Sequence, residues 1–207
     1  MADFIEIHPD NPQPRLIARA AEVLRSGGVV VYPTDSSYAL GCQLGEKAAL
    51  DRIRMIRRVD DKHNFTLVCR DLSEISTYAR IDNQAYRQLK SLTPGPYTFI
   101  YQATKQVPRR LLHPKRRAIG IRVPDAPIAR ALLTELDQPI LSTTLILPGD
   151  DLPLDDSYEI RETIGHCVDL IIDGGRCGTE PTTVVDMTQD PPVVVRAGKG
   201  DSSPFAL

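Results

Sequence analysis

Residues 29–42, which read VVVYPTDSSYALGC, constrain the fold of this chain more than any other stretch. The β-branched start is typical of a buried strand, and the strand is interrupted at Pro33, where small polar residues follow. Polar groups at a strand end need partners other than a neighbouring strand, and α/β proteins place ligands at such ends. An ordinary exit from a strand into a turn is the alternative that this stretch alone leaves open.

The composition is that of a globular chain. Its 207 residues are 42% hydrophobic and 25% charged, enough to bury one core, so we predict a single domain over residues 1–207 with its core at about 14–198. No stretch approaches the roughly 20 apolar residues of a membrane span, and the first residues do not resemble a signal peptide. We therefore expect a cytoplasmic protein without a membrane partner. The four cysteines are isolated, so we expect neither a disulfide nor a metal site.

Positive charge is concentrated although the net charge is only −2. Residues 83–124 contain no acidic residue, and a second basic cluster surrounds the end of a predicted helix near residue 58. Such a field attracts the phosphates of a nucleotide or of RNA, whereas a solvated basic surface without a partner is the alternative. The residues that we predict to bind RNA are Arg54, Arg58, Lys62, Lys105, Arg109, Arg110, Lys115, Arg116 and Arg117.

Hydrophobic periodicity predicts alternating helices and strands. Helices are expected over residues 16–24, 47–58, 82–90, 125–136 and 156–167, the fourth of them capped at its start. Strands are expected from residue 29 and over 65–69, 97–101, 118–123, 139–144, 168–172, 182–186 and 192–196. The last two strands are too close in sequence for a crossover helix, so they should be antiparallel. The pattern predicts a mixed α/β sheet.

Polar side chains interrupt several of these strand ends. Thr34 leaves the first strand, Arg122 lies inside another, and Arg196 ends the last. Guanidinium groups and hydroxyls suit phosphate and carboxylate, although the common P-loop, dinucleotide, hydrolase and zinc motifs are absent. Asp35 either closes its turn through an Asx bond or meets a metal beside a nucleotide, and we assign no metal there. His63 either contacts phosphate or acts as a proton carrier, and a structural hydrogen-bonding role is the alternative.

Six sequence blocks resemble the YrdC-like family and cover about residues 27–198. They are PTD at 33–35 with YALGC at 38–42, TPGPYT at 93–98, IRVP at 121–124, LSTT at 141–144, PTTVVD at 181–186 and VRAG at 195–198. Within that family the chain looks most like the YciO branch, through HPDNP at 8–12, HNFTL at 63–67 and VPRRLL at 107–112.

The resemblance implies a twisted, open, mixed α/β sheet flanked by helices, with a concave basic cleft. It also implies binding of ATP or AMP and of RNA, either tRNA or double-stranded. Well-known members are L-threonylcarbamoyl-AMP synthases, which use threonine, bicarbonate and ATP for tRNA threonylcarbamoyladenosine, so ATP with Mg²⁺ would enter as a substrate and no cofactor would be tightly bound. The nucleotide- and substrate-binding residues that follow are Thr34, Tyr38, Arg57, His63, Arg122, Ser142, Thr144, Thr183 and Arg196.

Two departures from the synthase pattern divide the possible functions. Synthases carry Lys-x-Arg where this chain has Arg57 and Val59, and Ser-x-Asn where it has Thr144 and Ile146. Loss of one donor that stabilises developing charge commonly lowers a rate by ~10²-fold or more. We therefore expect an RNA- and nucleotide-binding protein without the full synthase motif, and the alternative is a weak synthase. No catalytic residue is assigned.

Overall fold

The polar interruption at residues 34–37 is the turn of a hairpin. In the computed structural model, which describes residues 1–60, 63–112 and 117–205, β2 (Val30–Pro33) pairs antiparallel with β3 (Tyr38–Gln43). Every residue of both strands except Gln43 is buried. The turn therefore lies at the edge of the core, where its polar groups can face a cavity.

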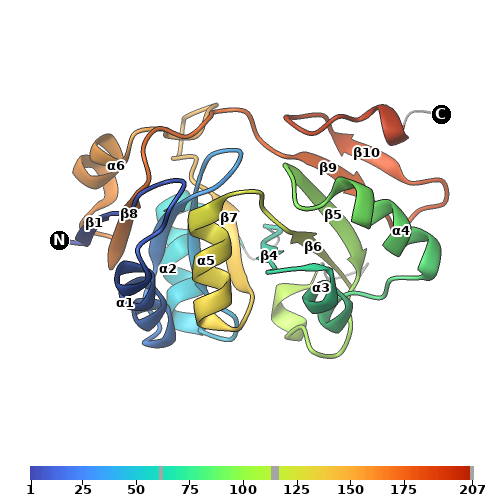
Figure 1. Cartoon of the computed structure of the whole chain (residues 1–207), viewed down its shortest axis with the longest axis horizontal. Helices are drawn as coiled ribbons and strands as arrows, with labels where there is room; N and C mark the ends of the chain where they lie inside the picture. Colours follow the sequence, from blue (N-terminus) through green and yellow to red (C-terminus); the bar gives the residue numbers. More distant parts are fainter. Residues whose placement is uncertain (61–62, 113–116, 206–207) are drawn as a thin grey trace.

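One mixed sheet runs through the described chain in the order β1-β8-β2-β3-β7-β4-β6-β5-β9-β10 (Figure 1). The other strands are β1 (Asp3–Glu6), β4 (Thr66–Val68), β5 (Tyr97–Gln102), β6 (Ala118–Arg122), β7 (Ile140–Thr144), β8 (Leu170–Asp173), β9 (Thr183–Asp186) and β10 (Val193–Arg196). β9 and β10 pair antiparallel, and β5 pairs parallel with β9. The predicted mixed sheet is confirmed.

Six helices flank this sheet within the described residues. They are α1 (Pro14–Arg25), α2 (Lys47–Arg57), α3 (Leu72–Tyr78), α4 (Asn83–Leu92), α5 (Pro127–Leu136) and α6 (Ser157–Ile164), and short 3₁₀ turns occur at Arg109–Leu111 and Ser203–Phe205. Asp82 and Asp156 accept hydrogen bonds from backbone N–H groups in the first turns of α4 and α6. The predicted cap of α5 is wrong: Ala126 precedes its first residue and makes no side-chain cap bond.

Residue alternation across the sheet separates its two faces. Leu141, Leu67, Ile121, Phe99 and Val185 are paired neighbours on β7, β4, β6, β5 and β9, and all are buried in one apolar cluster. Because successive side chains of a strand point to opposite faces, the residues next to them belong to the other face. We call the face of this cluster the closed face.

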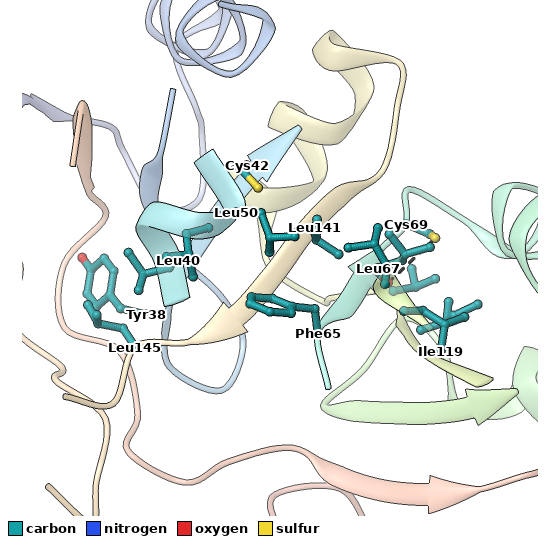
Figure 2. Close-up of a cluster of buried hydrophobic side chains, with 14 of the residues drawn as sticks. Tyr38, Leu40, Cys42, Leu50, Phe65, Leu67, Cys69, Ile119, Leu141 and Leu145 are labelled. Atoms are coloured by element: carbon teal, nitrogen blue, oxygen red, sulfur yellow. Dashed lines mark hydrogen bonds between the residues drawn. The ribbon is translucent and has the colours of Figure 1, made fainter. Parts of the chain in front are cut away.

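The closed face is covered by α2, α3, α4 and α6. Leu50 of α2, Ile75 of α3, Leu89 of α4 and Ile160 of α6 belong to the same apolar cluster. Figure 2 shows part of it, with Leu50 of α2 among the side chains of β3, β4 and β7 that belong to the same cluster. Burial of large aliphatic side chains contributes about 1.5–3 kcal/mol each, so this layer fixes the sheet on which the other face is built.

The opposite face is covered over part of its area. α1 and α5 pack against each other and over buried residues of β8, β2, β3 and β7, such as Leu170, Val30 and Ile140. The two helices lie together beside these strands in Figure 1, away from β5 and β9. We call this face the half-open face. None of the described helices is long and apolar enough to cross a membrane.

Candidate functional site: a cationic cleft

A cavity of about 550 Å³ lies on the half-open face. It begins at Ala39 and Val68, where the cluster under α1 and α5 ends, and extends over β4, β6, β5 and β9. One row of paired residues forms part of its wall, namely Ser142, Thr66, Gly120 and Ile100. Each is the chain neighbour of an apolar residue on the closed face. The register that builds the core therefore also builds this wall.

Gly120 keeps the wall open in the middle of this row. A Cβ atom at Gly120 would lie 3.2 Å from both the Thr66 hydroxyl oxygen and a methyl carbon of Thr98. A larger residue here would push these side chains or fill the cavity. The glycine therefore leaves room for a ligand to approach the backbone of β6.

Three guanidinium groups reach this cavity from separate elements. Arg57 ends α2, Arg122 ends β6 and Arg196 ends β10. Among the described residues that line the cavity, none is aspartate or glutamate. Convergent guanidinium groups beside low-dielectric walls favour anions such as phosphate and carboxylate.

Arg57 is held at the end of β7. Its Nη1 donates to the backbone oxygen of Thr144 and, at 3.4 Å, to the Thr143 hydroxyl oxygen. Burial lowers its pKa, and its buried Nε has no hydrogen-bond partner within the described chain. The cation is fixed at one end of the cavity with donor capacity left over.

Arg122 is paired with Asp35, and the exposed fractions of the two side chains are only 9% and 10%. Arg122 donates from Nη2 to the Asp35 carboxylate, which also accepts the backbone N–H of Asp125 at 3.1 Å. Lys199 Nζ donates to the Asp35 carbonyl oxygen at 2.5 Å. This pair joins the hairpin turn, β6, the start of α5 and the C-terminal segment.

The turn itself is closed by Thr34. Its hydroxyl oxygen accepts the backbone N–H groups of Ser36 and Ser37, both at 3.2 Å, and donates to the Ser37 carbonyl at 2.6 Å. Of the two roles considered for Asp35, the Asx bond is not formed, because the N–H groups of the turn bond to Thr34 and the Asp35 carboxylate accepts from Arg122 and from the N–H of Asp125. Within the described lining of the cavity, Ser37 is present and Thr34 is not.

Arg196 is positioned by Thr182. The guanidinium donates to the Thr182 carbonyl at 3.1 and 2.8 Å and to its hydroxyl at 3.1 Å. The Thr182 hydroxyl also shares a hydrogen bond of 3.0 Å with that of Thr98. Two hydroxyls that share one bond use one of their two protons, so this pair keeps a proton for a ligand beside Arg196.

Of the nine predicted binding residues, six line the cavity: Arg57, His63, Arg122, Ser142, Thr144 and Arg196. Tyr38 and Thr183 lie on the closed face, where their hydroxyls donate to the backbone oxygens of Gly175 and Gly200. Thr34, as described, closes the turn. The polar lining residues that the sequence reasoning missed are Ser37, Asn64, Thr66, Thr98, Thr143 and Thr182. Thr182 is the chain neighbour of Thr183, so the motif at 181–186 did mark its neighbourhood although it did not show which of the two faces the cavity.

Ser142 lines the cavity, but its hydroxyl is already engaged in two hydrogen bonds within the protein. It accepts from the Tyr32 hydroxyl at 2.8 Å and donates to the Leu40 carbonyl at 3.0 Å. Burial raises the pKa of Tyr32 to about 12, so Tyr32 remains a proton donor at neutral pH. This buried chain of hydrogen bonds fixes the middle of β7 next to the cavity.

The predicted RNA-binding residues occupy several places. Lys105, Arg109 and Arg117 line a second hollow of about 640 Å³ with Arg80, at the ends of β5 and β6. Arg110 donates to the Gly45 carbonyl at 2.6 Å, and Arg58 is exposed. Arg54 pairs with Asp51 and lies 5.8 Å from the Phe65 ring centroid. Lys62, Lys115 and Arg116 lie outside the described residues.

Resident metal ligands are not grouped in the described part of the chain. Within residues 1–60, 63–112 and 117–205, no three His, Cys, Asp or Glu side chains lie together in a way that could hold a metal ion. The four cysteines are free thiols, and Cys42 and Cys69 are buried. The polar groups that the described residues present to the cleft are guanidinium, imidazole, amide and hydroxyl groups.

A family model, a protein sequence and a solved structure all relate this chain to one family. The sequence matches the Sua5/YciO/YrdC family, described as "Telomere recombination", over residues 22–198. The "Uncharacterized protein YciO" of Escherichia coli K12 is 58% identical over 205 residues, covering 99% of this chain and 100% of that protein. The crystal structure of E. coli YciO superposes with a TM-score of 0.96 over 100% of both chains.

Two more distant relatives have informative names. A threonylcarbamoyl-AMP synthase of Nitrosococcus oceani is 30% identical over 156 residues, covering 75% of this chain and 83% of the synthase. The crystal structure of P. abyssi Sua5 complexed with L-threonine has 25% identity and a TM-score of 0.86. It covers 94% of this chain and 57% of the Sua5 chain.

The Asp35–Arg122 pair predicts a measurable stability difference. Asp35→Asn should lower the free energy of unfolding by about 3–5 kcal/mol, because it leaves a buried guanidinium without its carboxylate. Asp125→Asn is the control, since the exposed Asp125 side chain pairs with exposed Arg130 at 3.8 Å and its replacement should change stability by less than about 1 kcal/mol. Urea unfolding measures both. Equal, small losses would contradict a structural role for the pair, and adding Arg122→Met to Asp35→Asn should recover part of the loss.

Proposed function

Since the chain belongs to the Sua5/YciO/YrdC family, as its sequence blocks predicted, we propose that it binds a nucleotide in the cationic cleft and RNA on its basic surface, without efficient synthase catalysis. The observation that carries the proposal is the convergence of Arg57, Arg122 and Arg196 on one cavity whose described lining has no carboxylate. ATP and AMP are the candidate ligands, with ATP entering as its Mg²⁺ complex.

The shape and lining of the cleft support a nucleotide in particular. The cavity of about 550 Å³ falls in the range of about 300–1,000 Å³ that small-molecule sites occupy. Apolar side chains such as Ile100, Val184 and Val195 alternate with the hydroxyls and guanidinium groups. A ligand with a flat apolar part and an anionic part fits this mixture.

Relatives of this chain support an adenylate rather than an unrelated phosphate. The Nitrosococcus relative is named as a synthase of threonylcarbamoyl-AMP, and the P. abyssi Sua5 structure contains L-threonine. The polar frame around the cavity is retained here, which favours retention of binding.

A weak synthase is the second candidate, favoured by the same polar frame. Against it, Ile146 lines the cavity where the synthase pattern has asparagine, so no amide is available there to hold a phosphate or a metal-bound water. Val59 does not line the cavity, and its N–H donates to the Arg54 carbonyl. These differences support binding with weak or absent adenylyl transfer.

RNA binding is supported by the second hollow. Arg80, Lys105, Arg109 and Arg117 line it, and its described lining contains no acidic residue. Lysine and arginine side chains on an open surface bind phosphates with little dependence on base sequence.

Arg196→Ala should weaken binding of ATP and AMP by about 1.5–3 kcal/mol, or roughly 10- to 150-fold, because a charge-assisted hydrogen bond is lost. Isothermal titration calorimetry measures the dissociation constants. Arg176→Ala is the matched control, since Arg176 is exposed and pairs with Asp155 and Asp156. An unchanged constant for Arg196→Ala would remove this residue from the site, and no binding of either nucleotide would contradict the proposal.

RNA affinity should fall steeply with salt and with charge reversal in the hollow. Lys105→Glu combined with Arg109→Glu should reduce affinity for tRNA and double-stranded RNA and flatten the salt dependence. Arg15→Glu combined with Arg130→Glu makes the same change in net charge on α1 and α5, and should have a much smaller effect. Filter-binding assays over a series of salt concentrations measure the RNA affinities of both double variants. Equal effects of the two pairs, or no RNA binding at low salt, would refute this surface.

Restoring the two synthase residues should not restore a synthase. Val59→Arg combined with Ile146→Asn should leave threonylcarbamoyl-AMP formation from ATP, threonine and labelled bicarbonate low, because a misplacement of about one ångström can lower a rate ~10²-fold. A family synthase serves as positive control. Robust activity of the double variant would show that the site is a weakened synthase, and a parent as fast as the control would refute the argument from both residues.

A further inference from the structure

Three side chains at the β7 end of the cavity form a hydrogen-bonded chain. Arg57 Nη1 lies 3.4 Å from Thr143 Oγ1, and His63 Nε2 lies 3.0 Å from the same oxygen. All three residues line the cavity. They come from the end of α2, from the segment before β4 and from β7, so the sheet and α2 together fix their geometry.

The hydrogen-bond donors and acceptors of these three side chains allow two arrangements. Arginine only donates, so Thr143 Oγ1 accepts from Arg57. In the first arrangement the Thr143 hydroxyl donates to an unprotonated His63 Nε2. In the second, His63 Nε2–H donates to Thr143, and the hydroxyl proton of Thr143 is free to turn toward the cavity. A protonated imidazole permits only the second arrangement, because both of its nitrogens then carry protons.

The surroundings of His63 favour the neutral ring when the cavity holds no anion. Burial lowers the pKa of His63, and the positive charges of Arg57 and Arg54 on α2 lower it further, while Asp60 acts in the opposite direction. The other described contacts, the Phe65 ring of β4 at 5.1 Å and Thr143 of β7, carry no charge. An anion beside Arg57 would offset this positive field and so raise the pKa of the imidazole.

We propose that His63 and Thr143 form a proton-coupled anion-binding pair, in which a phosphate-bearing ligand that reaches Arg57 binds together with a proton taken up by the His63 imidazole. The proposal rests on nucleotide binding in the cleft and specifies the groups that receive the phosphate. The proton passes from solvent to the ring, Nε2–H donates to Thr143, and the Thr143 hydroxyl donates to the ligand. No covalent bond is formed or broken in the ligand.

The coupling has a defined sign. The pKa of His63 is lowered in the free protein and rises when the anion binds, so affinity should increase as pH falls between these two values and level off below the lower one. A histidine that only supports the fold would not link ligand affinity to proton uptake. His63 is therefore a positioning and charge-supplying residue whose effect appears in the proton balance.

Calorimetric titration with ATP in buffers of different ionisation enthalpy, near pH 7, measures the protons taken up per site. The wild-type protein should take up more protons than His63→Asn, by up to one per site, and the ionisation of ATP itself cancels in this comparison. Thr143→Ser keeps the hydroxyl and should keep the coupling. His8→Asn is the control, because His8 is exposed and its Nδ1 accepts the N–H groups of Asp10 and Asn11; it should match the wild type.

Equal proton uptake by wild type and His63→Asn, with ATP bound by both, would overturn the coupling and leave nucleotide binding intact. Failure of the wild type to bind ATP would overturn both. If His63→Asn binds too weakly to titrate, the imidazole resonances of His63 in the wild type decide. Their titration midpoint should rise when ATP is added, and an unchanged midpoint would overturn the proposal.

Discussion

The cleft depends on the pairing register of the sheet. Leu141, Leu67, Ile121 and Phe99 pack on the closed face, and their chain neighbours Ser142, Thr66, Gly120 and Ile100 line the cavity. A slip of one residue in any of these strands would exchange the two sets and put hydroxyls into the core. The apolar cluster therefore affects ligand binding indirectly, because it fixes the register and the register determines which side chains line the cavity.

The half-open face can hold a ligand because helices cover only part of it. α1 and α5 cover the strands from β8 to β7, and the cavity begins where their cluster ends. The strands that these helices leave uncovered expose polar and cationic side chains to water. Water hydrates these groups when no ligand is present, so their exposure does not destabilise the folded protein. The same groups become ligand contacts without rearrangement of the core.

The Asp35–Arg122 pair joins this scaffold to the chemistry. Placing both charges in a nearly dry position carries a desolvation penalty, which the geometry of the pair must offset. In return the guanidinium is held at the cavity wall in one orientation, and the hairpin turn, the start of α5 and Lys199 are drawn together. Preorganised donors of this kind bind anions without the entropy loss of ordering a mobile side chain.

Much of this arrangement could be predicted from the sequence, and the exceptions have physical causes. Long periodic segments such as α1 and α5 were visible, and six family blocks in order predicted the fold. α3, with seven residues, is too short for a clear helical period. β1 was missed because its two apolar residues lie between charged ones, whereas equally short strands such as β10 contain an uninterrupted apolar run. Tyr38 and Thr183 were predicted to line the cleft because they belong to family motifs. A motif shows which segment is near the cleft, but it does not show which of its side chains face the core, since that depends on the pairing register of the strand. The partner of Arg122 was hidden because Asp35 is far from it in sequence.

The measurement that tests this account most directly is a titration of ¹⁵N-labelled protein with AMP, followed by backbone and arginine side-chain NMR resonances. If the half-open face holds the ligand, the largest shifts should fall on residues 63–66, 118–122, 142–146 and 182–196, and on the guanidinium groups of Arg57, Arg122 and Arg196. Shifts confined to α1 and α5, or to the hollow lined by Lys105 and Arg109, would contradict it.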